Sequence, residues 1–395
     1  MHKALDGVRI LDLTRVLAGP FCTMVLADLG AEVIKVEMPG IGDDSRSAGP
    51  FVKGESSYFM SLNRGKKSLT LNLRHQEGKA VLKELVKKAD VLTENFRPGT
   101  MKKLELDYSV LSAENPRLIY AAISGFGQSG PYREKPAYDF IIQGMGGVMG
   151  LTAHPGGPPT RVPVAIGDIT AGLFAAIGIL SALRERDVSG QGQMIDVGML
   201  DCQVSLLENP LARYFATQEV PVPIGNTHPT LNPTGAYPTR DRYIIIGVGN
   251  DSLWKTFCQV MDRKEWIEDE RFTTNAKRTE NSAQLGELLT ELFRTRNTAD
   301  WIELLDNAWI PCGPINTVDE VANDPHIDFR KMIVSIEHPT AGEVKMTGVP
   351  IKMSRTPGAV DTPPPILGEH NDEILQRLLG YKRNKIKALR QKGTI

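Results

Sequence analysis

The stretch that decides the fold is GVRILDLTRVLAGPFCTMVLADLGAEVIKVE, residues 7–37. Residues 8–13 (VRILDL) and 32–37 (EVIKVE) have the apolar, β-branched composition of buried strands. Between them, PFCTMVLADLG predicts a helix, with Pro20 near its first position and Gly30 as its stop. A strand, a helix and a second strand form a βαβ unit, which indicates a parallel sheet.

The same alternation continues over the first 200 residues. Further strands are predicted at SLTLNL, VLTENF, LIYAAIS and MIDVGML, and helices at QEGKAVLKELVKKA and over residues 169–186. After about Asn209 the composition changes, because residues 221–235 (PVPIGNTHPTLNPTG) are dense in Pro, Gly, Thr and Asn, as in a linker. The fold class predicted is α/β, with a large parallel-sheet domain and a smaller unit after this linker.

Composition excludes several functions. The chain has 395 residues and a formal net charge of −1, so nothing indicates binding to nucleic acid or to an anionic membrane. Its four cysteines form no CxxC pair, which argues against a zinc site and fits a reducing compartment. The histidines show no ligand spacing, so no metal is expected. The N-terminus has no apolar signal region, and the longest apolar run, of 13 residues, is short for a membrane span. We expect a cytoplasmic protein; an organelle form remains an alternative.

One acid stands between apolar runs in VAIGDITAGLFAAIGIL, residues 164–180. Asp168 has two interpretations. As a helix N-cap it would accept a hydrogen bond from a free backbone N–H. As a nucleophile it would lie at the mouth of a closed pocket, where the helix N-terminus would help to keep it ionised.

A glycine-rich turn, GFGQSG (residues 125–130), matches the dinucleotide fingerprint but precedes Pro131 and no helix start. We therefore expect a tight turn at the carboxyl end of a strand, where ligands bind in open parallel sheets. Backbone N–H groups of such a turn stabilise oxyanions, so Gly127 and Gln128 are candidate donors.

Two loops are rich in basic residues. NRGKKS contains Arg64, Lys66 and Lys67, and NFRPGTMKKL contains Arg97, Lys102 and Lys103. Taken together they predict a rim that binds phosphates, whereas each residue alone fits a solvated surface side chain.

Several motifs together resemble class III CoA-transferases, the CaiB/BaiF family. They are the opening stretch, NRGKKSLTLNL, ENFRPG, GFGQSGPY, AIGDITAG, GQGQMIDVGMLD, IPCGPINTVDEVANDP and LGEHNDEIL, in this order along nearly the whole chain. The resemblance implies an interlocked homodimer. It also implies a Rossmann-like large domain from residues 1–209, completed by 326–395, and a small α+β domain at 225–325.

The resemblance makes Asp168 the nucleophile of a transfer in which CoA passes through an aspartyl anhydride and an aspartyl-CoA thioester. Coenzyme A is then a substrate, with no permanently bound cofactor. The positions that match the family's CoA contacts are Leu17, Ala18, Leu71, Asn72, Arg74, Asn95, Phe96, Arg97, Lys103 and Tyr138.

Within this family, the sequence is most similar to the succinyl-CoA:glutarate-type members. Leu17 and Met38 stand where formyl-CoA transferases carry Gln and Arg, which disfavours formate and oxalate as substrates. A small dicarboxylate is expected instead, held by His228, Asn232, Thr234 and Tyr237, unless these are ordinary turn residues.

Two other functions remain open. One is an acyl-CoA racemase of the same fold, disfavoured because Tyr138 replaces the racemase histidine and a phenol with a pKa near 10 exchanges protons poorly. The other is a non-catalytic acyl-CoA-binding protein, which would not need Asp168.

Overall fold

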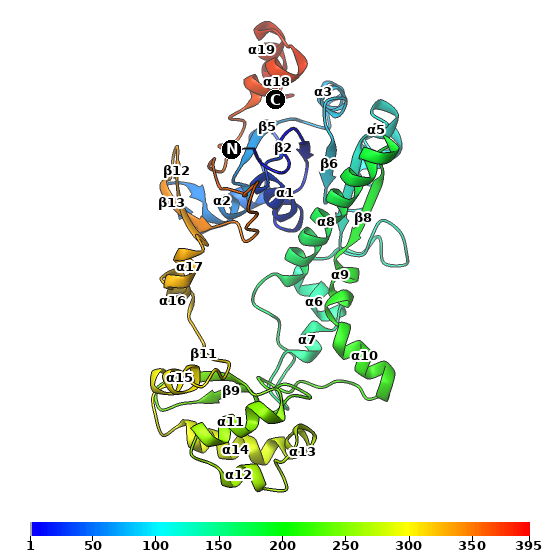
Figure 1. The fold of residues 1–395 in the computed structure, drawn as a ribbon. Helices are drawn as coiled ribbons and strands as arrows, with labels where there is room; N and C mark the ends of the chain where they lie inside the picture. Colours follow the sequence, from blue (N-terminus) through cyan, green and yellow to red (C-terminus); the bar gives the residue numbers. More distant parts are fainter. Residues whose placement is uncertain (1) are drawn as a thin grey trace. The chain divides into compact units, whose positions relative to one another are not determined.

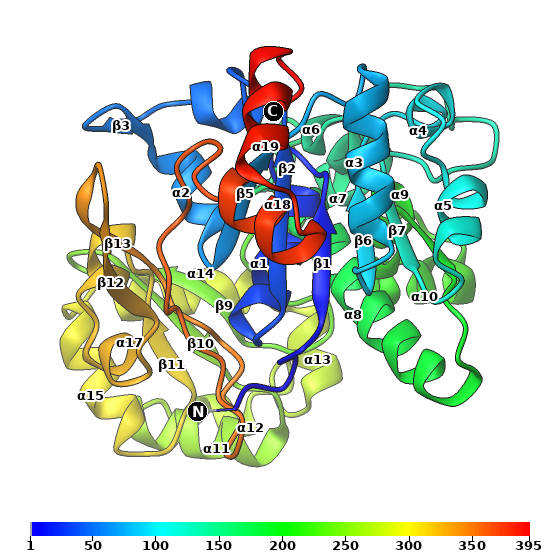
Figure 2. The same ribbon diagram turned by 90° about the horizontal axis from the view of Figure 1, so that it is seen from above.

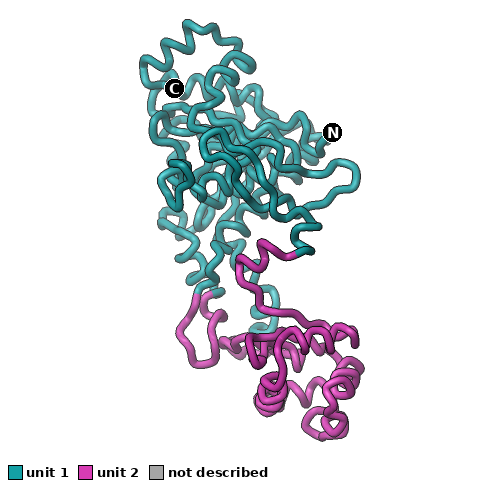
Figure 3. The backbone as a smooth tube through the Cα atoms, turned by 90° about the vertical axis from the view of Figure 1, so that its left-hand side faces the viewer, with its two compact units in different colours: residues 1–148, 161–216, 325–395 teal, residues 149–160, 217–324 magenta. Residues whose placement is uncertain are grey.

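The chain forms two compact units in a computed structural model that describes residues 2–395 (Figure 3). Unit 1 consists of Met1–Val148, Arg161–Ala216 and Pro325–Ile395. Unit 2 consists of Met149–Thr160 and Thr217–Asp324. The segment Met149–Thr160 belongs to unit 2, whereas the sequence predicts it in the large domain of residues 1–209. The chain thus leaves unit 1 and returns to it, and each unit has its own hydrophobic core.

A six-stranded sheet forms the centre of unit 1 (Figure 1). All its strand pairs are parallel, which confirms the α/β prediction. Its spatial order is β5 (Lys66–Thr70), β2 (Glu32–Glu37), β1 (Arg9–Asp12), β6 (Val91–Glu94), β7 (Ile119–Ser124) and β8 (Met194–Gly198).

The order of the strands reverses at β1. From β1 the chain builds outward to β2 and β5 on one side, and then to β6, β7 and β8 on the other. In such doubly wound sheets the loops after the two central strands diverge to opposite faces, leaving a crevice at the carboxyl ends of the strands. The crevice between β1 and β6 is therefore where a ligand is expected.

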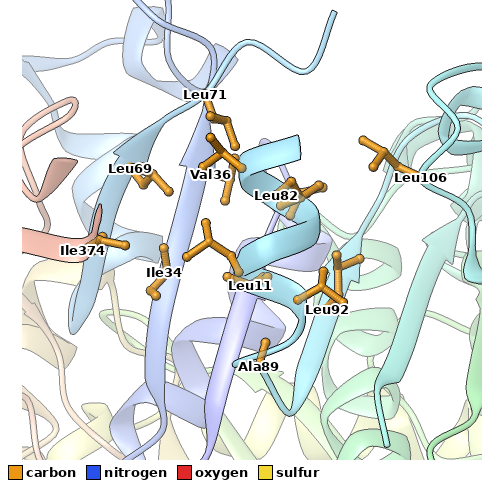
Figure 4. Close-up of a cluster of buried hydrophobic side chains, with 14 of the residues drawn as sticks. Leu11, Ile34, Val36, Leu69, Leu71, Leu82, Ala89, Leu92, Leu106 and Ile374 are labelled. Atoms are coloured by element: carbon orange, nitrogen blue, oxygen red, sulfur yellow. The ribbon is translucent and has the colours of Figure 1, made fainter. Parts of the chain in front are cut away.

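Helices cover both faces of the sheet because alternate strand residues point to opposite sides. Leu11 and Ile34 face a core that also contains Leu82 and Ile374 (Figure 4). Ile10 points to the opposite side of the sheet, where a second core lies. The first face is covered by α3 (Gln76–Val86), α5 (Tyr108–Glu114), α18 (Asn371–Leu379) and α19 (Arg383–Gln391). In Figure 2, α3, α18 and α19 lie in front of the sheet. The second face is covered by α1 (Ala18–Asp28), α6 (Asp139–Met145), α8 (Ile166–Ser189) and α9 (Met199–Leu206).

The helices α1 and α8 approach each other closely. A Cβ on Gly172 of α8 would lie 2.6 Å from the carbonyl oxygen of Ala18, so only glycine permits this crossing. By length and composition alone α8 could span a membrane. In this chain it packs against α1, α6, α9, β7 and β8, as the core helix of a globular domain does.

Shorter elements complete unit 1. Asp43 caps a 3₁₀ turn, η1, by accepting from the Ser45 backbone N–H. The elements are η1 (Asp44–Ser47), β3 (Phe51–Val52), β4 (Glu55–Ser56), α2 (Ser57–Asn63), α4 (Thr100–Lys103), α17 (Pro325–Phe329), β12 (Ile333–His338) and β13 (Gly342–Thr347). Two helices cross a boundary between the units, α7 (Val148–Leu151) and α10 (Glu208–Thr217).

Unit 2 is a small α+β unit. Its antiparallel sheet has the order β11 (Cys312–Pro314), β10 (Tyr243–Gly247) and β9 (Thr234–Pro238). Its core is aromatic, with Trp254, Phe257, Phe293 and Trp301 in mutual ring contact. The helices are α11 (Asp251–Val260), α12 (Glu265–Glu268), α13 (Asn275–Glu280), α14 (Ser282–Phe293), α15 (Thr298–Asp306) and α16 (Val318–Ala322).

Candidate active site

A cavity of about 210 Å³ opens at the switch point of the large sheet. The loop after β1 and the loop after β6 supply two of its walls, and Gly125 and Ala137 lie on a third. This is the crevice that the strand order predicts. Seven of the predicted site residues line it: Leu17, Ala18, Asn95, Phe96, Arg97, Tyr138 and Asp168.

A second cavity, of about 420 Å³, shares Arg15, Asp44 and Phe96 with the first. Its wall is mainly apolar and includes Leu71 and Met38. Of the remaining predicted CoA contacts, Leu71 and Arg74 line this second cavity, and the side-chain oxygen of Asn72 accepts from the Arg74 backbone N–H at 3.0 Å. Lys103 is exposed on α4 and lines neither cavity.

Asp168 lies in the first turn of α8 and is not its N-cap. The helix begins at Ile166, earlier than the sequence predicts, and its N-cap is Ala165, whose side chain has no acceptor atom. The N-cap interpretation of Asp168 is therefore wrong. The acid occupies the third helical position, close to the positive end of the helix dipole and at the wall of the cavity.

A neighbouring helix supplies the missing cap. Oδ1 of Asp139, the first residue of α6, accepts from the Gly167 backbone N–H at 2.7 Å. Nε2 of Gln143 donates to Oδ2 of the same carboxylate at 2.7 Å, and Oε1 of Gln143 accepts from the Val162 backbone N–H at 2.9 Å. The buried Asp139 carboxylate thus holds the N-terminus of α8, directly before the predicted nucleophile.

The electrostatic surroundings of Asp168 are unusual for an acid. Burial, and secondly the charge of Asp139, raise the pKa of Asp168 to about 7. The expected compensation by the helix N-terminus is therefore outweighed by desolvation. Burial, and then the charge of Asp168, raise the pKa of Tyr58 on α2 to about 12, which keeps this phenol protonated. A carboxylate that titrates near neutral pH in a cavity is a typical feature of catalytic sites.

Tyr58 and Asp139 were not predicted as site residues. Tyr58 belongs to no motif, so no local signal marks it. Asp139 follows the predicted Tyr138 directly, but its partner Gly167 lies 28 positions further along the chain. Only the packing of α6 against α8 brings the two together.

Gln128 is not brought together with Asp168. It lines a third cavity, of about 430 Å³, with Glu94 and Tyr120. Its backbone N–H already donates to the Asp196 carboxylate, at 2.9 Å to Oδ2. Gly127 has the left-handed φ of +84° expected for a tight turn. The turn does follow β7, as predicted, but only Gly125 of this motif lines the cavity that contains Asp168.

The prediction that NRGKKS forms a phosphate-binding rim is wrong. The Arg64 guanidinium is buried and pairs with Asp28 at 2.8 Å, and Lys66 Nζ is buried 3.0 Å from Asp12 Oδ2. Lys67 pairs with Glu32 and Glu373 on the surface. Lys66 begins β5 whereas Arg97 follows the end of β6, and in a parallel sheet these positions lie at opposite edges.

The predicted dicarboxylate-binding residues of the loop at 225–239 contact other residues of unit 2. Tyr237 is buried and stacks on Phe293, and the Asn232 carbonyl accepts from Arg278 Nε at 2.7 Å. Nδ1 of His228 accepts from the Leu231 backbone N–H at 3.0 Å. These contacts support the alternative that they are ordinary turn and core residues.

A doubly wound domain with cavities at its switch point, and an acid of raised pKa in one of them, has the features of the active site of an α/β enzyme. Comparison with known proteins identifies the class. The model of CoA-transferase family III matches residues 5–371. The chain therefore belongs to CoA-transferase family III and is an enzyme of the CoA-transferase class.

Curated relatives are similar along most of their length. The chain is 40% identical to mouse (Mus musculus) succinyl-CoA:glutarate CoA-transferase over 394 residues, covering 100% of this chain and 90% of the relative. It is 42% identical to succinyl-CoA–D-citramalate CoA-transferase of Chloroflexus aurantiacus, covering 100% and 98%. It is 44% identical to acetyl-CoA:oxalate CoA-transferase of Acetobacter aceti over 350 residues, covering 88% and 89%.

A solved structure has the same fold. The crystal structure of a CaiB/BaiF family protein from Brucella suis superposes with a TM-score of 0.86 at 41% identity. The match covers 96% of this chain and 100% of that one. The resemblance to the CaiB/BaiF family is confirmed.

Proposed function

We propose that this enzyme transfers CoA from succinyl-CoA to a small dicarboxylic acid of the glutarate type, with Asp168 as the covalent nucleophile. The observation that carries the proposal is the place of Asp168: a carboxyl of raised pKa in the first turn of α8, in one cavity with Asn95, Phe96 and Arg97. The names of the relatives support the substrate class.

The reaction balances with Asp168 as its only covalent participant. A carboxylate oxygen of Asp168 attacks the thioester carbonyl, the C–S bond breaks, and a mixed anhydride and CoA thiolate result. The thiolate then attacks the Asp168 carboxyl carbon, which releases the donor acid and leaves an aspartyl-CoA thioester. The acceptor carboxylate reverses these two steps, so that no water, proton or nucleotide is consumed.

The surroundings of Asp168 suit this chemistry. Partial burial keeps water from an anhydride and a thioester, both of which hydrolyse readily. The same burial makes the free carboxylate less stable, which favours its attack on the thioester. Burial and the charge of Asp168 raise the pKa of Tyr58 to about 12, so this phenol stays protonated.

Oxalate is the shortest dicarboxylate, and acceptors of the glutarate type are longer. The Acetobacter relative acts on oxalate according to its name, while the mouse and Chloroflexus relatives act on glutarate and D-citramalate. We favour the longer acids because two full-length matches carry such names. A comparison of glutarate, D-citramalate and oxalate as acceptors for succinyl-CoA tests this choice.

The active form is proposed to be a homodimer of interlocked chains. The outer faces of α8 and α6 carry exposed apolar side chains, among them Phe174, Ile177, Phe140 and Ile141. Exposed apolar patches of this kind indicate a protein interface. An active monomer in light scattering would contradict the dimer.

Hydroxylamine trapping tests the covalent step. With succinyl-CoA and hydroxylamine, the wild-type protein should gain a hydroxamate at Asp168, detectable by peptide mass spectrometry. Asp168→Ala should lose transfer and trapping while keeping CoA affinity within about tenfold, ~1.4 kcal/mol. The matched control is Asp201→Ala, which removes an exposed acid from the first turn of α9 and should keep both. Transfer by Asp168→Ala would refute the mechanism.

A further inference from the structure

The loop between β1 and α1, residues 13–17, forms a wall of both ligand cavities. Its first part lines the larger apolar cavity and its last part lines the cavity of Asp168. Val16 in this loop has φ of +68°, in the left-handed region. A β-branched residue is rarely found there, and the strain costs about 1–3 kcal/mol, so surrounding contacts must hold it in place.

Side chains from other elements hold the backbone on either side of Val16. The Thr14 carbonyl accepts from Lys35 Nζ at 2.9 Å. The Arg15 backbone N–H donates to Asn95 Oδ1 at 2.8 Å, and the Arg15 carbonyl accepts from Asn95 Nδ2 at 2.8 Å. The loop after β6 therefore binds the loop after β1 through one amide side chain.

The strained residue itself is bound by an acid. The Val16 backbone N–H donates to Oδ1 of Asp43 at 3.0 Å. The same oxygen accepts from the backbone N–H and hydroxyl of Ser45, at 2.9 and 2.8 Å. Oδ2 of Asp43 lies 2.7 Å from Lys35 Nζ, and both side chains are 0% exposed. One buried ion pair thus reaches the loop at two points, Thr14 through Lys35 and Val16 through Asp43.

Stability alone does not explain this ion pair. Burying two charges costs several kcal/mol of desolvation, which their attraction repays only in part. The positive charge of Lys35 holds the pKa of Asp43 below its usual range despite burial, so the carboxylate stays ionised as an acceptor. A neutral apolar pair would fill the same space but would offer no acceptor to Val16 and no donor to Thr14.

We propose that Asp43 and Lys35 are positioning residues for acyl-CoA: they hold the strained Val16 loop in the conformation that shapes both cavities. The proposal rests on the proposed function, in which these cavities bind acyl-CoA. Lys35 lines neither cavity, and Asp43 lies at the wall of the larger one with its side chain fully buried against Lys35. Their effect is carried by the backbone of residues 14–17 to Leu17 and Ala18, which line the cavity of Asp168.

Two variants test the proposal by different routes. Asp43→Asn keeps the size of the side chain but turns an amide toward the Lys35 ammonium. Val16→Pro keeps every buried charge paired but removes the N–H that Asp43 accepts and forces φ to about −65°. The matched control is Asp28→Asn, which breaks the buried Asp28–Arg64 pair, whose side chains are 5% and 2% exposed, outside both cavities.

The readouts are the Kd of CoA by titration calorimetry, KM and kcat for succinyl-CoA, and the thermal midpoint. Asp43→Asn and Val16→Pro should each raise Kd and KM about tenfold, with kcat within about threefold. Asp28→Asn should lower the thermal midpoint and leave Kd and KM unchanged. If Asp43→Asn does not fold, Val16→Pro decides the question.

Two results would overturn the inference alone: a Kd within twofold of wild type in Val16→Pro, or an equal rise of Kd in Asp28→Asn. A wild-type protein that bound no CoA and transferred none would overturn the proposed function, and the inference with it.

Discussion

Replacing Asp139 with asparagine should change the pH at which the enzyme becomes active. The asparagine side chain would still present an oxygen to the Gly167 backbone N–H, which Asp139 now binds at 2.7 Å, so the start of α8 should be preserved. Its amide nitrogen would take the place of the oxygen that accepts from Gln143 Nε2, so this one hydrogen bond is lost. The negative charge that disfavours ionisation of Asp168 would be gone. The pKa of Asp168 should therefore fall, while burial, the larger cause, keeps it above that of a free acid.

The size of the effect follows from the two causes. The pKa of Asp168 is raised from 3.8 to about 7, mainly by burial. The charge of Asp139 is the smaller cause, and each pKa unit that it contributes corresponds to ~1.4 kcal/mol. The attacking form is the carboxylate, so activity falls as the pH falls through the pKa. At pH 6 about a tenth of Asp168 is ionised in the wild-type enzyme, so kcat/KM of the variant should rise there by up to about tenfold, with no gain at pH 8.

The assay is the pH profile of kcat/KM for succinyl-CoA between pH 5 and 9. The CoA 3′-phosphate also titrates, near pH 6, but it is the same in both enzymes, so the difference between their profiles belongs to the protein. The control is Glu185→Gln, on the same helix 17 residues from Asp168, about 25 Å along the axis and beyond the range of screened charges. A wild-type midpoint near 4, or equal midpoints in Asp139→Asn and wild type, would refute the reasoning.

Three further outcomes are expected. Arg97→Ala should raise KM for succinyl-CoA at least fivefold more than it lowers kcat, because a phosphate contact made equally in ground and transition states contributes to binding alone. A fall in kcat only would show that Arg97 acts in the chemical step. Asp168→Asn should stabilise the fold by about 4 kcal/mol at pH 8 and by about none at pH 4, because between pH 3.8 and about 7 the native state binds the extra proton and wild-type stability falls as the pH rises. Equal chemical-denaturation midpoints at pH 8 would contradict this. Glutarate should exceed butyrate as acceptor by at least about a hundredfold in kcat/KM, ~2.7 kcal/mol. A site whose polar groups bind the second carboxylate of glutarate would leave those groups unpaired with the monoacid. Comparable rates would show that no such groups bind the second carboxylate.

The architecture of unit 1 could be predicted because its signals are local. Residues 8–13 and 32–37 contain the buried strands β1 and β2, and the helix between them ends where Gly30 adopts φ of +112°. Each βαβ unit repeats this pattern, and parallel pairing follows because the helix returns the chain to the side of the sheet at which the preceding strand began. The loops that line the cavities could be predicted for the same reason, since they follow directly from strand ends.

The wrong prediction that NRGKKS and the loop of Arg97 form one phosphate-binding rim has a physical explanation. Lys66 precedes its strand and Arg97 follows its strand, so a parallel sheet places them at opposite edges. That signal was present in the sequence. By contrast, the burial of Lys66 with Asp12 and of Lys35 with Asp43 depends on contacts between strands and loops that no local pattern records. Long-range ion pairs of this kind become visible only once the elements are packed.

The start of α8 shows why the surroundings of Asp168, the proposed nucleophile, could not be predicted from the sequence. A helix with Ser or Asp at the position of Ala165 would carry its own cap, and its first turn would need no second element. Here the acceptor is a carboxylate from α6, so the group that fixes the helix also places a negative charge beside Asp168. Geometry and pKa thus depend on one side chain. Asp139→Asn removes the charge and keeps the acceptor, whereas Asp139→Ala removes both. The two variants should share one pH midpoint, and any further loss of kcat in Asp139→Ala measures what the cap contributes to the position of Asp168.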